Sequence, residues 1–194
     1  RRQILAYDPI NNWKAWDKRG SVLMQVGDVE ASLADLKRVN EARPYNFLFL
    51  LDYSNALLIS GDTTACIRRL NLFLEAFPNN VDVLLRRSYV NIISGNYQLS
   101  LEDINHLNLL GYNPPTLRCR KALCLYGLKK YKLTLELCDE IIKLKSQSIL
   151  GEAYFIKALA TYQSGDADKA CSYLGEARKN SYTVEGTLYD DICN

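Results

Sequence analysis

The chain has 194 residues, of which 48% are hydrophobic and 24% are charged, and this composition suits one folded domain or one continuous repeat array. Its 24 basic and 22 acidic residues leave a net charge of +2, so no broad basic field is available to attract nucleic acid or an anionic membrane surface. No apolar run approaches the roughly 20 residues of a membrane-spanning helix, so we expect no membrane insertion.

Residues 1–12 contain the stretch Ile4–Pro9, which we predict to be the last turns of a preceding repeat helix. Beyond it, glycines followed by Asp or Asn recur at Gly27-Asp28, Gly61-Asp62, Gly95-Asn96 and Gly165-Asp166. The intervals from 27 to 61 and from 61 to 95 are both 34 residues. A third step of 34 reaches Lys129, and Gly165 lies 36 residues beyond it. We therefore expect a two-residue insertion, which we place in Lys145–Ile149.

A second set of helix-breaking sequences lies halfway between these turns. It consists of Pro44–Asn46, Pro78–Asn80 and Asn113–Pro115. Proline cannot continue a helix, glycine ends one by adopting a positive φ, and the following Asp or Asn can cap the next helix. Each 34-residue period is therefore predicted to hold two antiparallel helices of about a dozen residues, joined by short turns.

The side chains repeat in register with the turns. Five units are predicted at 13–46, 47–80, 81–114, 115–150 and 151–184. Position 8 is small in every unit (Gly20, Ser54, Ser88, Ala122, Ala158), and so is position 20 (Ser32, Cys66, Ser100, Thr134, Ala170). These positions face each other where the two helices of a pair cross, and a bulky side chain there would push the helix axes apart. Positions 24 and 27 carry mainly larger apolar side chains that can pack on the next unit.

This period and register resemble the tetratricopeptide repeat (TPR) family. The resemblance covers about residues 13–184, with Arg118 departing from the apolar residue that the family has at position 4. It implies an all-α fold, a right-handed α-solenoid of about five TPR-type helix pairs. Residues 185–194 are predicted to form a C-terminal capping helix with Leu188 and Ile192 on one side.

No group of residues in the sequence points to catalysis, metal binding or cofactor binding. The single histidine, His106, has no motif around it that would support a catalytic triad. The glycines are spaced as turns and not clustered as in a phosphate-binding loop, and no Cys-x-x-Cys pair suggests zinc. We therefore predict a protein that is not an enzyme, with no catalytic residue, no metal and no cofactor.

The six cysteines allow two interpretations of the compartment. Cys66, Cys119, Cys124 and Cys138 fall on apolar faces or at helix crossings, so we predict free, packed thiols, which favours a reducing compartment such as the cytoplasm. The alternative is a disulfide between Cys171 and Cys193 of the capping helix. Such a bond would indicate an oxidising compartment, the periplasm or the endoplasmic reticulum lumen.

The family resemblance also implies a binding surface, because the first helices of TPR units line a concave groove that commonly binds peptides or helices. The predicted partner-binding residues are Leu51, Asn55, Leu85, Arg86, Tyr89, Arg120, Tyr126, Phe155 and Tyr162. The tyrosines combine an apolar ring with a polar tip, which suits a half-exposed interface. The carboxylate clamp of chaperone-binding TPR domains is not expected. Only two of the clamp residues, Asn55 and Arg120, have a match in this sequence.

Two functions remain open from the sequence. The first is a scaffold or adaptor that binds a peptide or helix of a partner protein in the groove. The alternative is a structural segment of a larger multi-repeat or self-associating assembly, without a free peptide-binding groove.

Overall fold

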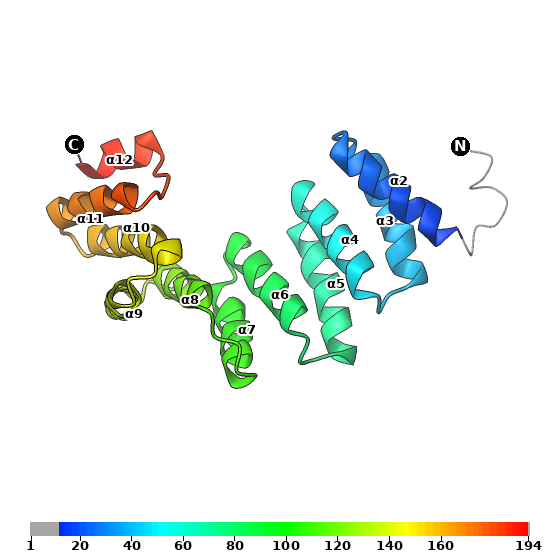
Figure 1. Ribbon diagram of the computed structural model, residues 1–194, viewed down its shortest axis with the longest axis horizontal. Coiled ribbons are helices and arrows are strands. Elements are labelled where there is room, and N and C mark those ends of the chain that lie inside the picture. The colour runs from blue at the N-terminus through cyan, green and yellow to red at the C-terminus, as the bar shows by residue number, and fades with distance from the viewer. Residues whose placement is uncertain (1–11, 194) are drawn as a thin grey trace. The chain divides into compact units, whose positions relative to one another are not determined.

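Eleven α-helices and no β-strand make up the part of the chain that the computed structural model describes, residues 12–193 (Figure 1). They are α2 (Trp13–Gln25), α3 (Val29–Ala42), α4 (Phe47–Ile59), α5 (Thr63–Ala76), α6 (Val81–Ile93), α7 (Tyr97–Leu109), α8 (Pro115–Gly127), α9 (Tyr131–Lys143), α10 (Gln147–Gln163), α11 (Ala167–Lys179) and α12 (Gly186–Cys193). The predicted all-α helical-repeat class is confirmed. The helix predicted at the start of the chain falls on residues 1–11, outside the described residues.

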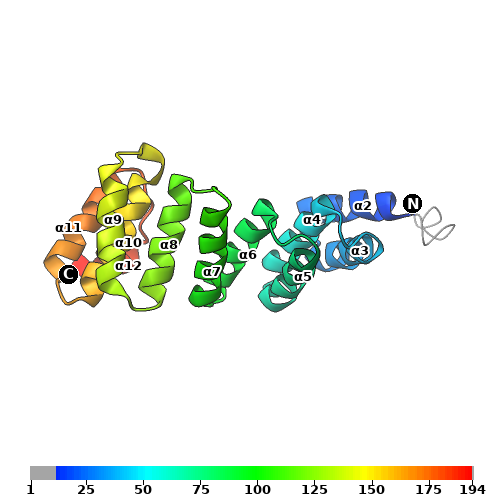
Figure 2. The same cartoon turned by 90° about the horizontal axis from the view of Figure 1, so that it is seen from below.

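The helices belong to two compact units, which divide between Ser94 and Gly95. Unit 1 holds α2 to α6, and each of these helices packs against the next one along the chain. Unit 2 holds α7 to α12 and is built in the same way, and Figure 2 shows α8, α9 and α10 side by side within it. Among the described helices, none has both the length and the hydrophobicity needed to cross a membrane.

The turns within the helix pairs share one backbone conformation. Gly27, Gly61, Gly95 and Gly165 have φ values of 82°, 82°, 74° and 91°. Lys129, which stands at the fourth turn of the 34-residue register, has φ 59°. A left-handed conformation costs a residue with a side chain about 1–2 kcal/mol, so the position of Lys129 is set by the repeat and not by its own preference.

Short polar side chains begin most of these helices. Those that accept a hydrogen bond from a backbone N–H of the first turn are Asp28, Asn46, Asp62, Asn80 and Asp166. The expected cap at Asn96 was wrong, because its side chain makes no cap hydrogen bond with α7. Its ψ of 55° is close to those of Asp28 and Asp62 at the equivalent turns, 75° and 68°, and both of these residues cap their helices, so the backbone angle does not account for the missing bond.

The small residues at positions 8 and 20 are buried in all five of the predicted repeats. At the α2–α3 crossing, the hydroxyl of Ser32 donates a hydrogen bond of 2.7 Å to the carbonyl oxygen of Gly20. A Cβ added to Gly20 would lie 2.8 Å from Cγ of Leu36, which is closer than real side-chain contacts allow. Packing between the helices therefore requires the small residue that the sequence pattern repeats.

The two-residue insertion lengthens a helix. α9 ends at Lys143, and α10 already begins at Gln147, four residues before Gly151, where the fifth unit was predicted to start. Much of the segment predicted to hold the insertion is therefore helical. The turn is tight, with Lys145 at φ 52°.

Candidate partner-binding faces

The predicted partner-binding residues all lie on the first helices of their pairs. In unit 1 they are Leu51 and Asn55 on α4 and Leu85, Arg86 and Tyr89 on α6; in unit 2 they are Arg120 and Tyr126 on α8 and Phe155 and Tyr162 on α10. Asn55, Tyr89 and Tyr162 are exposed and the other six are half-buried, so none is a fully enclosed core residue. The residues of unit 1 and those of unit 2 are called the unit 1 face and the unit 2 face below.

The unit 1 face combines half-buried leucines with an exposed aromatic ring. Leu51 and Asn55 are one turn apart on α4, as are Leu85 and Tyr89 on α6, so each pair lies on one side of its helix. Tyr89 is 43% exposed, which leaves much of its ring in contact with solvent. A half-buried apolar bed with an exposed tyrosine is the composition of many protein interfaces.

Two carboxylates of unit 1 were not part of the predicted set. Burial raises the pKa of Asp17 on α2, although the charge of Lys18 partly offsets this shift. Burial also raises the pKa of Asp52 on α4, and the negative charge of Asp17 raises it further. One oxygen of Asp17, Oδ1, is buried without a hydrogen-bond partner. The two residues occupy groove positions 5 and 6, so the register itself could have drawn attention to this acidic pair.

Arg86 lies near the buried thiol of Cys66. Burial raises the pKa of Cys66, and the positive charge of Arg86 partly opposes that shift. The neighbouring Arg87 donates a hydrogen bond of 2.8 Å to Oδ1 of Asn71 on α5. The two adjacent arginines of α6 therefore have different surroundings within unit 1.

Tyr126 on the unit 2 face belongs to a group of three tyrosines. Its ring centroid lies 5.9 Å from that of Tyr131, and burial, followed by Tyr131 and Tyr97, raises the pKa of its hydroxyl. The ring of Tyr97 also lies against the end of α8, where a Cβ added to Gly127 would come within 2.4 Å of it. The tyrosines of α7, α8 and α9 thus meet at the end of α8, and Tyr126 contributes to packing as well as to the surface.

Phe155 and Tyr162, on the same helix, differ in their surroundings. The ring of Phe155 stacks on Tyr182 with 4.7 Å between centroids, and it packs against the buried clusters around Ile156 and Leu174. Tyr162 lies near the end of α10 and is 39% exposed. Phe155 therefore already has partners within the chain, whereas Tyr162 presents its ring to solvent.

Arg120 faces an acidic residue of the chain itself. Burial raises the pKa of Glu152 on α10, and the positive charge of Arg120 on α8 is the main influence that lowers it. Cys119, next to Arg120, is fully buried and its pKa is raised by burial and by the charge of Glu152. Cys119, at position 5 of the repeat 115–150, is therefore not accessible to a partner.

The four cysteines predicted to be free thiols are free, and the disulfide that the sequence left open as an alternative is present. Cys66, Cys119, Cys124 and Cys138 are free and buried. Burial raises the pKa of Cys138 to about 12, so its thiol stays neutral and is a poor nucleophile. Cys171 and Cys193 form a disulfide with 5.0 Å between their Cα atoms. Within the described residues, no group of three or more His, Cys, Asp or Glu side chains could hold a metal ion.

Solved structures share the arrangement of these helices. MamA 41-end from Desulfovibrio magneticus RS-1 superposes with a TM-score of 0.72 at 15% identity, covering 88% of this chain and 96% of that one. A tetratricopeptide repeat protein from Parabacteroides merdae ATCC 43184 has a TM-score of 0.65 at 12% identity, covering 98% and 87%. No family model matches the sequence, and no curated protein matches it. The fold that these helices form is of the tetratricopeptide repeat type.

Proposed function

We propose that the chain is a protein-binding helical repeat that holds a peptide or a helix of a partner protein on its first helices. The observation that carries the proposal is the exposure of Tyr89 on α6 of unit 1 and of Tyr162 on α10 of unit 2, each of which is the first helix of its pair. A tyrosine at an interface buries a large ring at a low cost in side-chain entropy, and its hydroxyl finds a hydrogen-bond partner there.

Half-buried neighbours on the same helices support this proposal. Leu51 and Leu85 add apolar area that a partner can cover. Arg86 adds a cationic group that can bind a carboxylate of the partner through two parallel hydrogen bonds. Phe155 contributes less in this proposal than the sequence suggests, because its ring is stacked within the chain.

A second candidate is a segment of a larger or self-associating assembly that uses the second helices. Leu99 on α7 and Leu133 on α9 are both 49% exposed, and each stands at position 19 of its predicted repeat. They lie outside the predicted groove positions. Repeated exposed leucines on second helices favour contact with further repeats or with another copy.

Single substitutions separate the two candidates once a partner has been purified by affinity to the intact protein. Tyr89→Ala and Tyr162→Ala should each raise the Kd for the partner by about tenfold or more, because truncating an aromatic anchor typically costs more than about 1.4 kcal/mol of binding free energy. The melting temperature should stay nearly unchanged, since both rings are exposed. Tyr112→Ala is the matched control, because Tyr112 is 37% exposed but lies in the turn before α8.

Normal binding by both variants would contradict the proposal that the first helices bind the partner. In that case Leu99→Ser and Leu133→Ser become the informative variants. A fall in molecular mass by light scattering for these two would support the assembly candidate.

A further inference from the structure

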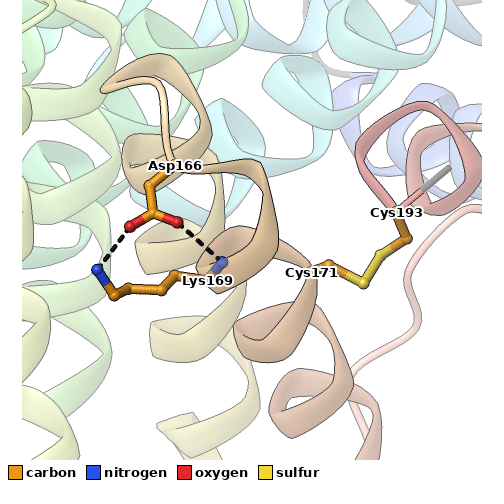
Figure 3. Close-up of a disulfide and its surroundings, with 4 residues drawn as sticks. All are labelled: Asp166, Lys169, Cys171 and Cys193. Carbon is orange, nitrogen blue, oxygen red and sulfur yellow. Dashed lines mark hydrogen bonds and ion pairs between the residues drawn. A yellow bond between two sulfur atoms is a disulfide. The ribbon is translucent and has the colours of Figure 1, made fainter.

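α12 is attached to the preceding helix by a covalent bond. Cys171 is in the first half of α11 and Cys193 is the last residue of α12, and Figure 3 shows the disulfide that joins them. The bond closes a segment with a sequence separation of 22. α12 packs on α11, in the cluster that includes Leu174 and Ala177.

The contacts that hold α12 without the disulfide are few. Of its eight residues only Ile192 is buried, and Leu188 and Tyr189 are half-buried. The guanidinium of Arg178 lies 3.6 Å from the ring centroid of Tyr189, at a surface where such a contact adds about 0.5–1 kcal/mol. An isolated helix shorter than about 12 residues is marginal in water, so α12 depends on its attachment to α11.

Among the cysteines of the described residues, only the two in this bond are reached by solvent. Cys171 and Cys193 are both half-exposed, whereas Cys66, Cys119, Cys124 and Cys138 are fully buried thiols. A dithiol reductant can attack one sulfur of the disulfide as a thiolate, and its second thiolate then resolves the mixed disulfide. The S–S bond breaks, two electrons and two protons pass to Cys171 and Cys193, and the reductant is oxidised to its own disulfide.

We propose that the Cys171–Cys193 pair is a redox latch on α12. In the oxidised chain the latch holds α12 over α11, and in the reduced chain α12 leaves and uncovers the side of α11 on which it packed. An oxidising compartment keeps the latch closed and a reducing compartment opens it. In a helical-repeat array the next helix packs on such a surface, so reduction exposes a place where a further helix can bind.

Hydrogen–deuterium exchange on the 194-residue chain, with and without dithiothreitol under native conditions, tests the latch. Reduction should speed exchange in Gly186–Cys193 by about tenfold or more, the signature of local opening, while α8 to α10 exchange as before. Oxidised glutathione should restore slow exchange. The double variant Cys171→Ser/Cys193→Ser should show the fast rate with and without dithiothreitol.

Ile192→Ala gives a second measurement that keeps the disulfide. It should leave α12 slow to exchange in the oxidised chain, and after reduction α12 should exchange as fast as in the reduced parent chain. Equal exchange in α12 before and after reduction would overturn the latch. So would a parallel rise through α8 to α10, which would make the bond a staple of the whole unit, or a disulfide that dithiothreitol cannot reduce in the folded chain.

Discussion

At the scale of single residues, the repeat brings two carboxylates, Asp17 and Asp52, close together. They are on neighbouring first helices of unit 1, where burial raises both pKa values and Asp17 raises that of Asp52 further. A carboxyl group whose pKa is higher in the folded than in the unfolded chain stabilises the fold most when protonated. Its contribution is complete below the unfolded pKa and is lost as the pH rises through the folded pKa.

Asp52→Asn should therefore raise the melting temperature at pH 7, because the amide removes a half-buried negative charge beside Asp17. The gain should shrink as the pH falls through the raised folded pKa of Asp52, and it should be smallest below the ordinary Asp pKa of 3.8, where the wild-type carboxyl is neutral in both states. Thermal unfolding across the pH range, followed by circular dichroism, measures both values. Glu102→Gln, at an exposed carboxylate of α7, is the control. A gain of the same size at both ends of the pH range would contradict the explanation.

At the scale of the helices, similar turns use different interactions. Asp62 caps α5 by accepting a hydrogen bond of 2.8 Å from the N–H of Ala65, whereas Asn96 makes no such bond with α7. Lys129 holds a left-handed backbone where three earlier turns have glycine. The second helices of the pairs therefore begin at the same register position even where the local chemistry is less favourable, because packing between helices provides most of their stability.

Asp62→Ala should lower the free energy of unfolding by about 1 kcal/mol, since the variant loses a side-chain cap and leaves an N–H of α5 without its acceptor. Asn96→Ala is the matched comparison at the equivalent turn, and we expect less than half of that loss. Urea unfolding of the two variants and the parent chain provides the free energies. Equal losses would show that Asn96 caps α7 in solution.

At the scale of the whole chain, the cysteines divide into two chemical classes. Four are buried thiols in the helix cores of the two units, and two are joined in the Cys171–Cys193 disulfide. Burial raises the pKa of Cys66, Cys124 and Cys138, which keeps these thiols protonated and slow to react.

Thiol titration should therefore find four reactive groups in the denatured, unreduced chain and six after reduction. In the native, unreduced chain the reaction should be slow, because thiolate forms only when a buried site opens. Native reaction of four thiols at the denatured rate would contradict the burial of the free cysteines. A count of six without reduction would contradict the disulfide.

Much of the fold could be predicted from sequence because its signals are local. Glycine at positive φ, proline at helix boundaries and small residues at helix crossings each act within one period, and their spacing repeats. Two details departed from the pattern: the side chain of Asn96 makes no cap hydrogen bond with α7, and α10 absorbs the insertion as added helix.

The candidate faces depended more on contacts between residues far apart in the chain. Position in the register was enough to select Tyr89 and Tyr162, which are exposed. It could not show that Tyr182, beyond the second helix, stacks on Phe155, or that Asp17 acts on Asp52 across two helices. Both depend on side-chain directions after packing, which one helix period does not specify.

By itself, then, the sequence determined the helical repeat and its register, because the period is written in backbone preferences and in side-chain size. Tertiary structure alone decided whether Cys171 and Cys193 are joined, since disulfide formation requires two Cα atoms within a few ångströms. Cys171 and Cys193 meet that requirement at 5.0 Å because α12 turns back onto α11. The other four cysteines are buried in the hydrophobic core between helices, and each is a free thiol.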